Sequence, residues 1–108
     1  MVYTNNKKYI ADYKINQTKF DEGIIYTEND VSAYDMAISH ANLLAKQYPI
    51  DPSTQKTIVE LTDLFEMDDK NNKRDVKFDK TESIVELAET EKGFSKIEQD
   101  LAENHWDD

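Results

Sequence analysis

Among the side chains that could act as acids, bases or ligands, the carboxylates of aspartate and glutamate are the most abundant in this sequence. Its 108 residues include 23 aspartates and glutamates against 13 lysines and arginines, for a formal net charge of −10 at pH 7. The charge is uneven: residues 1–27 carry four lysines against three acids, a balance of +1, whereas residues 81–108 carry nine acids against two lysines, a balance of −7. Such a surface repels nucleic acid and anionic lipid and attracts basic partners.

The other candidates for chemistry do not form a motif. His40 and His105 are the only histidines and cysteine is absent, so we expect no zinc site, thiolate nucleophile or disulfide. Ser39 next to His40 is not a catalytic pair on a helix, because adjacent helical side chains diverge. Gly23 and Gly93 are the only glycines, too few for a phosphate-binding loop. We therefore expect no enzymatic activity and no cofactor.

Two segments suggest a ligand by composition alone. In "DDKNNKRD", an EF-hand loop starting at Asp68 places Lys70 at a ligand position, one starting at Asp69 places Lys73 there, and no glycine is present. The segment "KKYIADYKINQTKF" mixes lysine and tyrosine as nucleic-acid-binding surfaces do, but its tyrosines fall on the face that a core needs. We expect neither a bound metal nor direct nucleic-acid binding.

The elements that position these residues begin with a β-hairpin within residues 1–27. Residues 9–15 and 20–27 are rich in β-forming side chains, and a polar turn separates them. A helix is predicted over residues 30–48, where apolar side chains recur every three or four positions until Pro49 ends the run.

The four letters IVEL occur twice in the second half of the chain. Residues 82–91 place apolar side chains in one helical sector and acids in the opposite one, which predicts an amphipathic helix within an acidic helical region, residues 81–106. Residues 56–66 fit a helix and a strand about equally, and residues 67–79 form a polar loop with a short strand near its end. The sequence thus predicts one α+β domain, residues 1–108, with an N-terminal β-hairpin, a long central helix and a helix-rich acidic C-terminal third.

This C-terminal third is the candidate binding surface. Carboxylates four positions apart on a helix lie about 6 Å from one another, close to the spacing of phosphates on a nucleic-acid strand. The predicted partner-binding residues are Glu82, Glu86, Glu89, Asp100, Glu103, Asp107 and Asp108. The alternative is that this acidic face is only solvated and keeps the protein in solution.

The short, cysteine-free, tyrosine-containing and strongly acidic chain resembles the small inhibitors of phages and mobile elements, of the anti-CRISPR and anti-restriction type, that imitate nucleic acid. The resemblance covers charge and size, with no shared motif. It implies a non-enzymatic protein that inhibits a nucleic-acid-handling protein by occupying its basic groove. The implied partner is a basic protein such as a nucleic-acid-binding nuclease.

A second hypothesis, from a different class, is a structural or assembly accessory protein that binds through an apolar patch. Met36, Leu43 and Leu64 lie outside the main apolar stripes and would form that patch. The start of the chain has no signal-peptide pattern, and no stretch approaches the roughly 20 apolar residues that span a bilayer. We therefore expect a soluble, cytoplasmic protein with no membrane partner.

Overall fold

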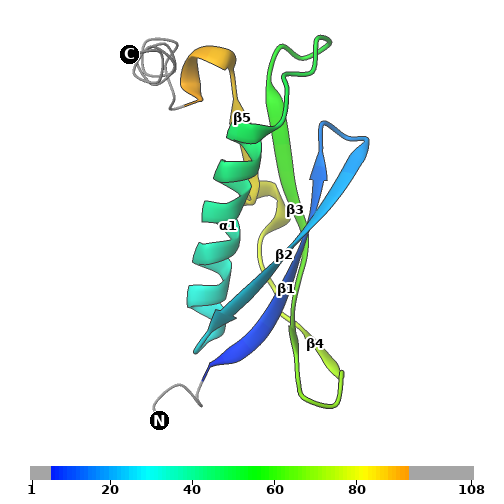
Figure 1. The fold of residues 1–108 in the computed structure, drawn as a ribbon, viewed down its shortest axis with the longest axis vertical. Helices are drawn as coiled ribbons and strands as arrows, with labels where there is room; N and C mark the ends of the chain where they lie inside the picture. The colour runs from blue at the N-terminus through cyan, green and yellow to red at the C-terminus, as the bar shows by residue number, and fades with distance from the viewer. Residues whose placement is uncertain (1–5, 93–108) are drawn as a thin grey trace, which may run out of the picture.

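Two strands joined by a tight turn begin the fold. In the computed structural model, which describes residues 6–92, β1 (Lys7–Ile15) and β2 (Lys19–Thr27) pair antiparallel along their whole length (Figure 1). Asn16 and Gln17 in the turn have φ values of 50° and 66°, the left-handed backbone that asparagine tolerates and that hairpin turns favour. The Asn16 side chain also accepts a hydrogen bond from the backbone N–H of Ile58 (2.8 Å), which ties the hairpin to the next strand.

Helix α1 (Asp30–Gln47) follows the hairpin, where the periodicity of the sequence places a helix. Asn29 caps its start by accepting a hydrogen bond from the Ser32 N–H (2.8 Å), and the chain turns extended at Tyr48, just before proline. The side chains that α1 turns toward the sheet are small and buried, so the helix lies close to the strands; they include Ala33, Ala37, Ala41 and Ala45.

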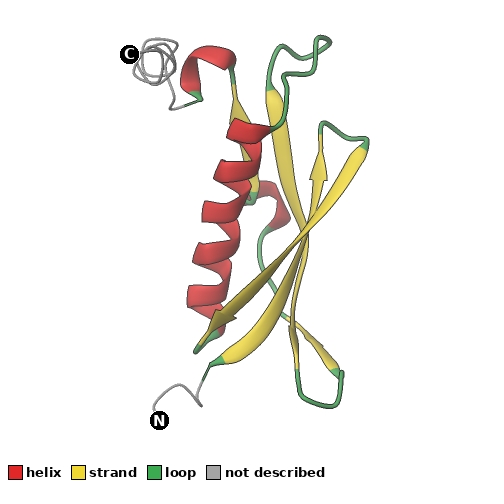
Figure 2. Cartoon of the chain, in the orientation of Figure 1, coloured by secondary structure: helices red, strands yellow, loops and turns green. Residues whose placement is uncertain are grey.

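The remaining strands complete one antiparallel sheet of five strands. The long strand β3 (Thr57–Met67) pairs with β1, and two short strands share its other edge, β4 (Lys73–Asp75) near its end and β5 (Ile84–Leu87) near its start (Figure 2). Two short 3₁₀ turns, η2 (Lys80–Glu82) and η3 (Glu89–Glu91), flank β5. The order across the sheet is therefore β2-β1-β3, followed by β4 and β5.

One face of the sheet packs against α1 and forms the core. β1, β2, β3 and β5 give side chains to this face, and β1 gives four that are completely buried: Tyr9, Ala11, Tyr13 and Ile15. The Tyr13 hydroxyl donates to the carbonyl of Ala37 (2.7 Å), and the Tyr34 and Ser83 hydroxyls bond to each other (2.7 Å). Among the described residues no buried polar side-chain atom lacks a hydrogen-bond partner.

The predicted fold class is wrong in its C-terminal third. Residues 81–92 contain a four-residue strand between two 3₁₀ turns rather than an amphipathic helix, and residues 93–106 lie outside the described part of the chain. The run Ile84–Leu87 satisfies a period of two as well as a helical period, and the free edge of β3 selects the strand. Val85 and Leu87 then pack on the core, whereas Ile84 and Glu86 point away from it. Within residues 6–92 the fold is a five-stranded antiparallel sheet with one α-helix.

The two IVEL stretches prove to be direct neighbours. In the pairing of β3 with β5, Val59 lies opposite Val85, Ile58 opposite Glu86 and Glu60 opposite Ile84. Because the two copies of the motif pair antiparallel, the two valines lie opposite each other in the centre, and an isoleucine lies opposite a glutamate on either side. Residues 56–66, for which helix and strand were equally favoured, are thus almost entirely β3.

Candidate functional site

The open face of the sheet, turned away from α1, gathers carboxylates from three strands. Asp12 on β1 lies directly opposite Glu22 on β2 and directly opposite Asp63 on β3. Side chains in such opposed positions have Cβ atoms about 5 Å apart. We call Glu22, Asp12 and Asp63 the acidic row; they line a shallow hollow together with Phe20 and Thr62.

The electrostatics of the acidic row are unfavourable at neutral pH. Partial burial, followed by the neighbouring charges of Glu22 and Asp63, raises the pKa of the Asp12 carboxyl, and Lys73 opposes the shift. Like charges directly opposite one another in a sheet are destabilising. The ionised carboxylates of the acidic row therefore lower the stability of the folded protein.

A β-bulge in β3 completes the row. The pairing with β1 passes from Asp12 opposite Asp63 to Tyr13 opposite Leu61, so Thr62 is an extra residue without a partner. Its hydroxyl donates to the carbonyl of Asp12 (3.0 Å). Because Leu61 faces the core, strict alternation would also turn Asp63 toward the core, and the bulge instead places Asp63 on the open face and Leu64 inside.

Apolar side chains flank the acidic row on both sides. On one side, Ile10 lies opposite both Ile24 and Phe65, and Ile24 is 55% exposed. On the other side, Phe20 is 73% exposed, the largest aromatic exposure among residues 6–92, and lies opposite Lys14 of β1. A charged strip between exposed apolar side chains has the mixed character of a protein-binding surface rather than of a purely solvated one.

The predicted partner-binding residues do not form the expected helical row. Glu82 lies on η2, Glu86 on β5 and Glu89 on η3, all three exposed but on separate elements, and Glu86 pairs with Lys56 (3.3 Å). The other four predicted residues lie outside the described part of the chain: Asp100, Glu103, Asp107 and Asp108.

The predicted apolar patch is present in part. Met36 and Leu43 are 44% and 52% exposed on α1, whereas Leu64 is buried in the core, so its inclusion in the patch is wrong. Met36 and Leu43 line a groove between α1 and β2, together with the Gly23 segment of β2 and His40. The His40 ring packs on Tyr13 at 5.4 Å between ring centroids and lies against Gly23, where an added Cβ would stand 3.0 Å from its Cδ2 atom. His40 is thus a packing residue.

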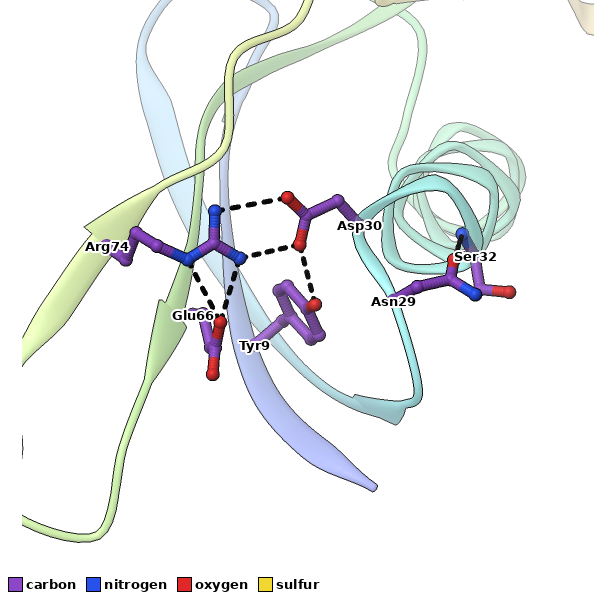
Figure 3. Close-up of polar contacts among 6 residues, drawn as sticks. All are labelled: Tyr9, Asn29, Asp30, Ser32, Glu66 and Arg74. Carbon is purple, nitrogen blue, oxygen red and sulfur yellow. Dashed lines mark hydrogen bonds and ion pairs between the residues drawn. The ribbon is translucent and has the colours of Figure 1, made fainter. Parts of the chain in front are cut away.

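Arg74 is the centre of an ionic cluster that holds β4 against the start of α1 (Figure 3). Its guanidinium donates two hydrogen bonds to Asp30 (3.1 and 2.7 Å) and two to Glu66 (3.1 and 2.8 Å), and the Tyr9 hydroxyl donates to Asp30 (2.7 Å). These bonds lower the pKa of Asp30, while burial and Asp30 raise the pKa of Tyr9 to about 12. Because the guanidinium is bonded on both sides within the protein, we assign the cluster a structural role.

The acidic row is the feature that reading the sequence missed. Asp12 and Glu22 alternate with core residues of the hairpin, so their pairing follows once the turn is fixed. No such pattern predicts the position of Asp63, because the face of the sheet on which it lies depends on the bulge at Thr62. Within residues 6–92, no group of three or more histidines, aspartates and glutamates is arranged to hold a metal ion.

In comparisons with known proteins, no protein-family model, no curated protein and no solved structure matches the chain. None of the described helices has the length and apolar character needed to cross a membrane. The function is therefore argued from the geometry of the open face and of the groove beside α1.

Proposed function

We propose that this protein is a non-enzymatic acidic binding protein that inhibits a nucleic-acid-handling protein by occupying its basic groove. The surface that it presents is the open face of the sheet, centred on the acidic row. The observation that carries the proposal is the direct opposition of Glu22, Asp12 and Asp63 across three strands.

The spacing of the acidic row suits a groove that holds nucleic acid. Adjacent strands lie about 4.8 Å apart, so three carboxylates occur within roughly 10 Å. One strand of duplex DNA carries a charge about every 3.4 Å of its axis, which is the same order of charge density. Lysines and arginines that contact phosphates would find a comparable line of anionic oxygens here.

The energetics favour a basic partner as well. Each like-charged pair across a sheet costs roughly 0.2–1 kcal/mol in the free protein. A lysine or arginine placed between the carboxylates removes that repulsion and adds charge-assisted hydrogen bonds. Exposed Phe20 and Ile24 on either side supply apolar contact area that salt does not weaken.

The experiment captures a nucleic-acid-binding nuclease from host lysate on the immobilised protein and then measures whether the protein displaces labelled DNA from that nuclease. We expect displacement at low salt and its progressive loss as salt rises. A triple variant, Glu22→Gln with Asp12→Asn and Asp63→Asn, should displace DNA at least tenfold more weakly, a loss of about 1.4 kcal/mol.

A matched control removes three carboxylates elsewhere, by Glu28→Gln, Asp35→Asn and Asp69→Asn. These residues are exposed and lie off the acidic row, and the net charge changes by the same amount. Equal inhibition by the two triple variants would show that only overall charge matters and would refute the assignment to the open face.

The second candidate function is that of a structural or assembly accessory protein. It is favoured by the groove between α1 and β2, where Met36 and Leu43 are exposed together. A partner held there would be retained at high salt, whereas a partner held by the acidic row would be released. Washing captured complexes at two salt concentrations separates the two functions.

A further inference from the structure

An aromatic ring lies beside the acidic row on the open face of the sheet. Phe65 on β3 is directly opposite Ile10 on β1 and Asp75 on β4, so these side chains share one face. Asp63 precedes Phe65 by two residues on that face, and Asp12 is its diagonal neighbour across the pairing with β1. Diagonal neighbours lie about 7–8 Å apart, within reach of a long side chain. Three positions that carry carboxylates therefore neighbour Phe65.

A cation of the protein itself covers this ring. The Nζ atom of Lys73 on β4 lies over the Phe65 ring, 4.4 Å from the ring centroid. A cation within about 6 Å of an aromatic centroid is attracted by the electron-rich face of the ring. Phe65 is only 7% exposed although it lies on the face turned away from α1, and Lys73 is part of its cover. The open face thus already binds one ammonium group.

The Lys73 side chain leans along the sheet toward the acidic row. Lys73 is paired with Met67, whereas the ring that it covers belongs to Phe65, two residues closer to Asp63 along β3. The charge of Lys73 also reaches Asp12, whose raised pKa it opposes. Among residues 6–92, however, Lys73 forms no ion pair with a carboxylate. Its ammonium contacts the ring and leaves the acidic row without an ion pair in this part of the chain.

The backbone that carries Lys73 is held in place by the next residue, Arg74. Successive residues of a strand point to opposite faces, so Lys73 lies on the open face and Arg74 on the core side. Arg74 is bonded to both Asp30 and Glu66, which fixes β4 against α1 and β3 (Figure 3). Lys73 can therefore leave the ring by rotation of its own side chain, without movement of β4, and it regains rotamer freedom when it does so.

We propose that Phe65 and its neighbouring carboxylates bind an arginine side chain of the basic partner, and that Lys73 occupies this place in the free protein. We call Phe65 with Asp12, Asp63 and Asp75 the arginine subsite. This subsite rests on the proposed function, which supplies the basic partner, and it names the side chain that the partner must present. On binding, the partner's arginine displaces Lys73 from the ring.

Arginine suits the subsite better than the lysine that it displaces. A guanidinium is planar, so it stacks on an aromatic face while the N–H groups at its edge donate to carboxylates. Lys73 is tethered to β4 and reaches the ring alone. An arginine that enters from solvent contacts the ring and the acidic row together, and its charge-assisted hydrogen bonds to Asp12 or Asp63 add to the stacking.

The first test removes the internal cation. The Lys73→Ala variant of the full chain should bind a short, fluorescently labelled oligoarginine peptide about threefold more tightly than the control does, since a cation over an exposed ring is worth a factor of roughly two to five in an equilibrium constant. The control is Lys77→Ala, which removes the same charge from an exposed residue beside α1. Loss of folding cannot produce a gain in affinity. Equal affinities of the two variants would overturn the subsite.

The second test asks whether the gain depends on the ring. Phe65→Leu keeps an apolar side chain but removes the aromatic face. In this background most of the difference between Lys73→Ala and Lys77→Ala should disappear, and circular dichroism checks that each variant folds. An undiminished difference would show that Lys73 acts only through its charge on the acidic row, and it would refute the part assigned to Phe65.

Nuclear magnetic resonance follows the displacement directly. The ring current of Phe65 shifts the signals of the Lys73 methylene protons next to Nζ, and this shift should vanish as oligoarginine is added to the wild type. Peptide binding that leaves the Lys73 signals unchanged would overturn the displacement. An oligolysine peptide of the same length should remove less of the shift at equal concentration, because an ammonium cannot stack and donate in the same way. Equal effects of the two peptides would refute the preference for arginine.

Failure of the arginine subsite is distinguishable from failure of the proposed function. If the triple variant of the acidic row lost DNA displacement while Lys73→Ala and Lys77→Ala bound oligoarginine equally, the acidic row would act without the subsite. If oligoarginine displaced Lys73 as expected while the wild type displaced no DNA from a nuclease, the subsite would stand and the inhibitory function would be refuted.

Discussion

Replacing Asp12 with asparagine should stabilise the free protein. Asp12 is the central member of the acidic row and takes part in both of its like-charged pairs, with Glu22 and with Asp63. Each such pair costs roughly 0.2–1 kcal/mol, so removing both should raise the free energy of unfolding by about 1 kcal/mol. For a domain of this size the melting temperature should rise by about 5 °C.

The pH dependence of this gain has a definite sign. The pKa of Asp12 is raised in the folded protein, so folding favours its protonated form, and ionisation costs stability as the pH rises through that pKa. The Asp12→Asn variant does not ionise at this position. Its advantage over the wild type should therefore be present at pH 7 and vanish below the ordinary carboxyl pKa of 3.8.

Urea denaturation at pH 7 and pH 3, each at low salt and at about 1 M salt, measures the effect. At 1 M salt the screening length is about 3 Å, shorter than the separation of the paired carboxylates, so the gain should largely disappear. Asp35→Asn is the control, because Asp35 is an exposed aspartate of α1 away from the row. If Asp12→Asn were no more stable than this control, or if the gain survived 1 M salt, the electrostatic account of the row would be refuted.

Three further predictions concern the fold. Arg74→Met should lower the free energy of unfolding by about 1 kcal/mol and reduce the stability that the protein loses on acidification. The reason is that the lowered pKa of Asp30 stabilises the fold above pH 3.8, and this contribution is lost as the pH falls. Urea titrations measure both effects, with the exposed Lys77→Met as the control. Stability should fall as the pH rises from 10 toward about 12, because Tyr9 must ionise, and tyrosinate absorbance should report the same transition. Deletion of Thr62 should be tolerated, as judged by circular dichroism, because it removes the extra residue of the bulge and regular alternation then keeps Leu61 and Leu64 in the core and Asp63 on the open face; loss of the fold would refute this account of the bulge.

The parts of the fold that follow from the sequence are those with local signals. The hairpin is defined by alternation around a turn whose asparagine accepts a left-handed backbone, and α1 is defined by its periodicity and by its cap at Asn29. Strand β3 was ambiguous for a physical reason. Its buried residues are odd-numbered up to Leu61 and include Leu64 beyond the bulge, so neither a period of two nor a helical period fits the whole segment.

Strand β5 could not be predicted because its signal is not local. Four residues are too few to separate a strand from one turn of a helix, and the acids that follow imitate the polar face of a helix. Only the free edge of β3 decides the outcome, and that edge exists only once the sheet has formed. The acidic row was hidden in the same way, because Glu22 and Asp63 are 10 and 51 positions away from Asp12 in sequence and only strand pairing brings the three together.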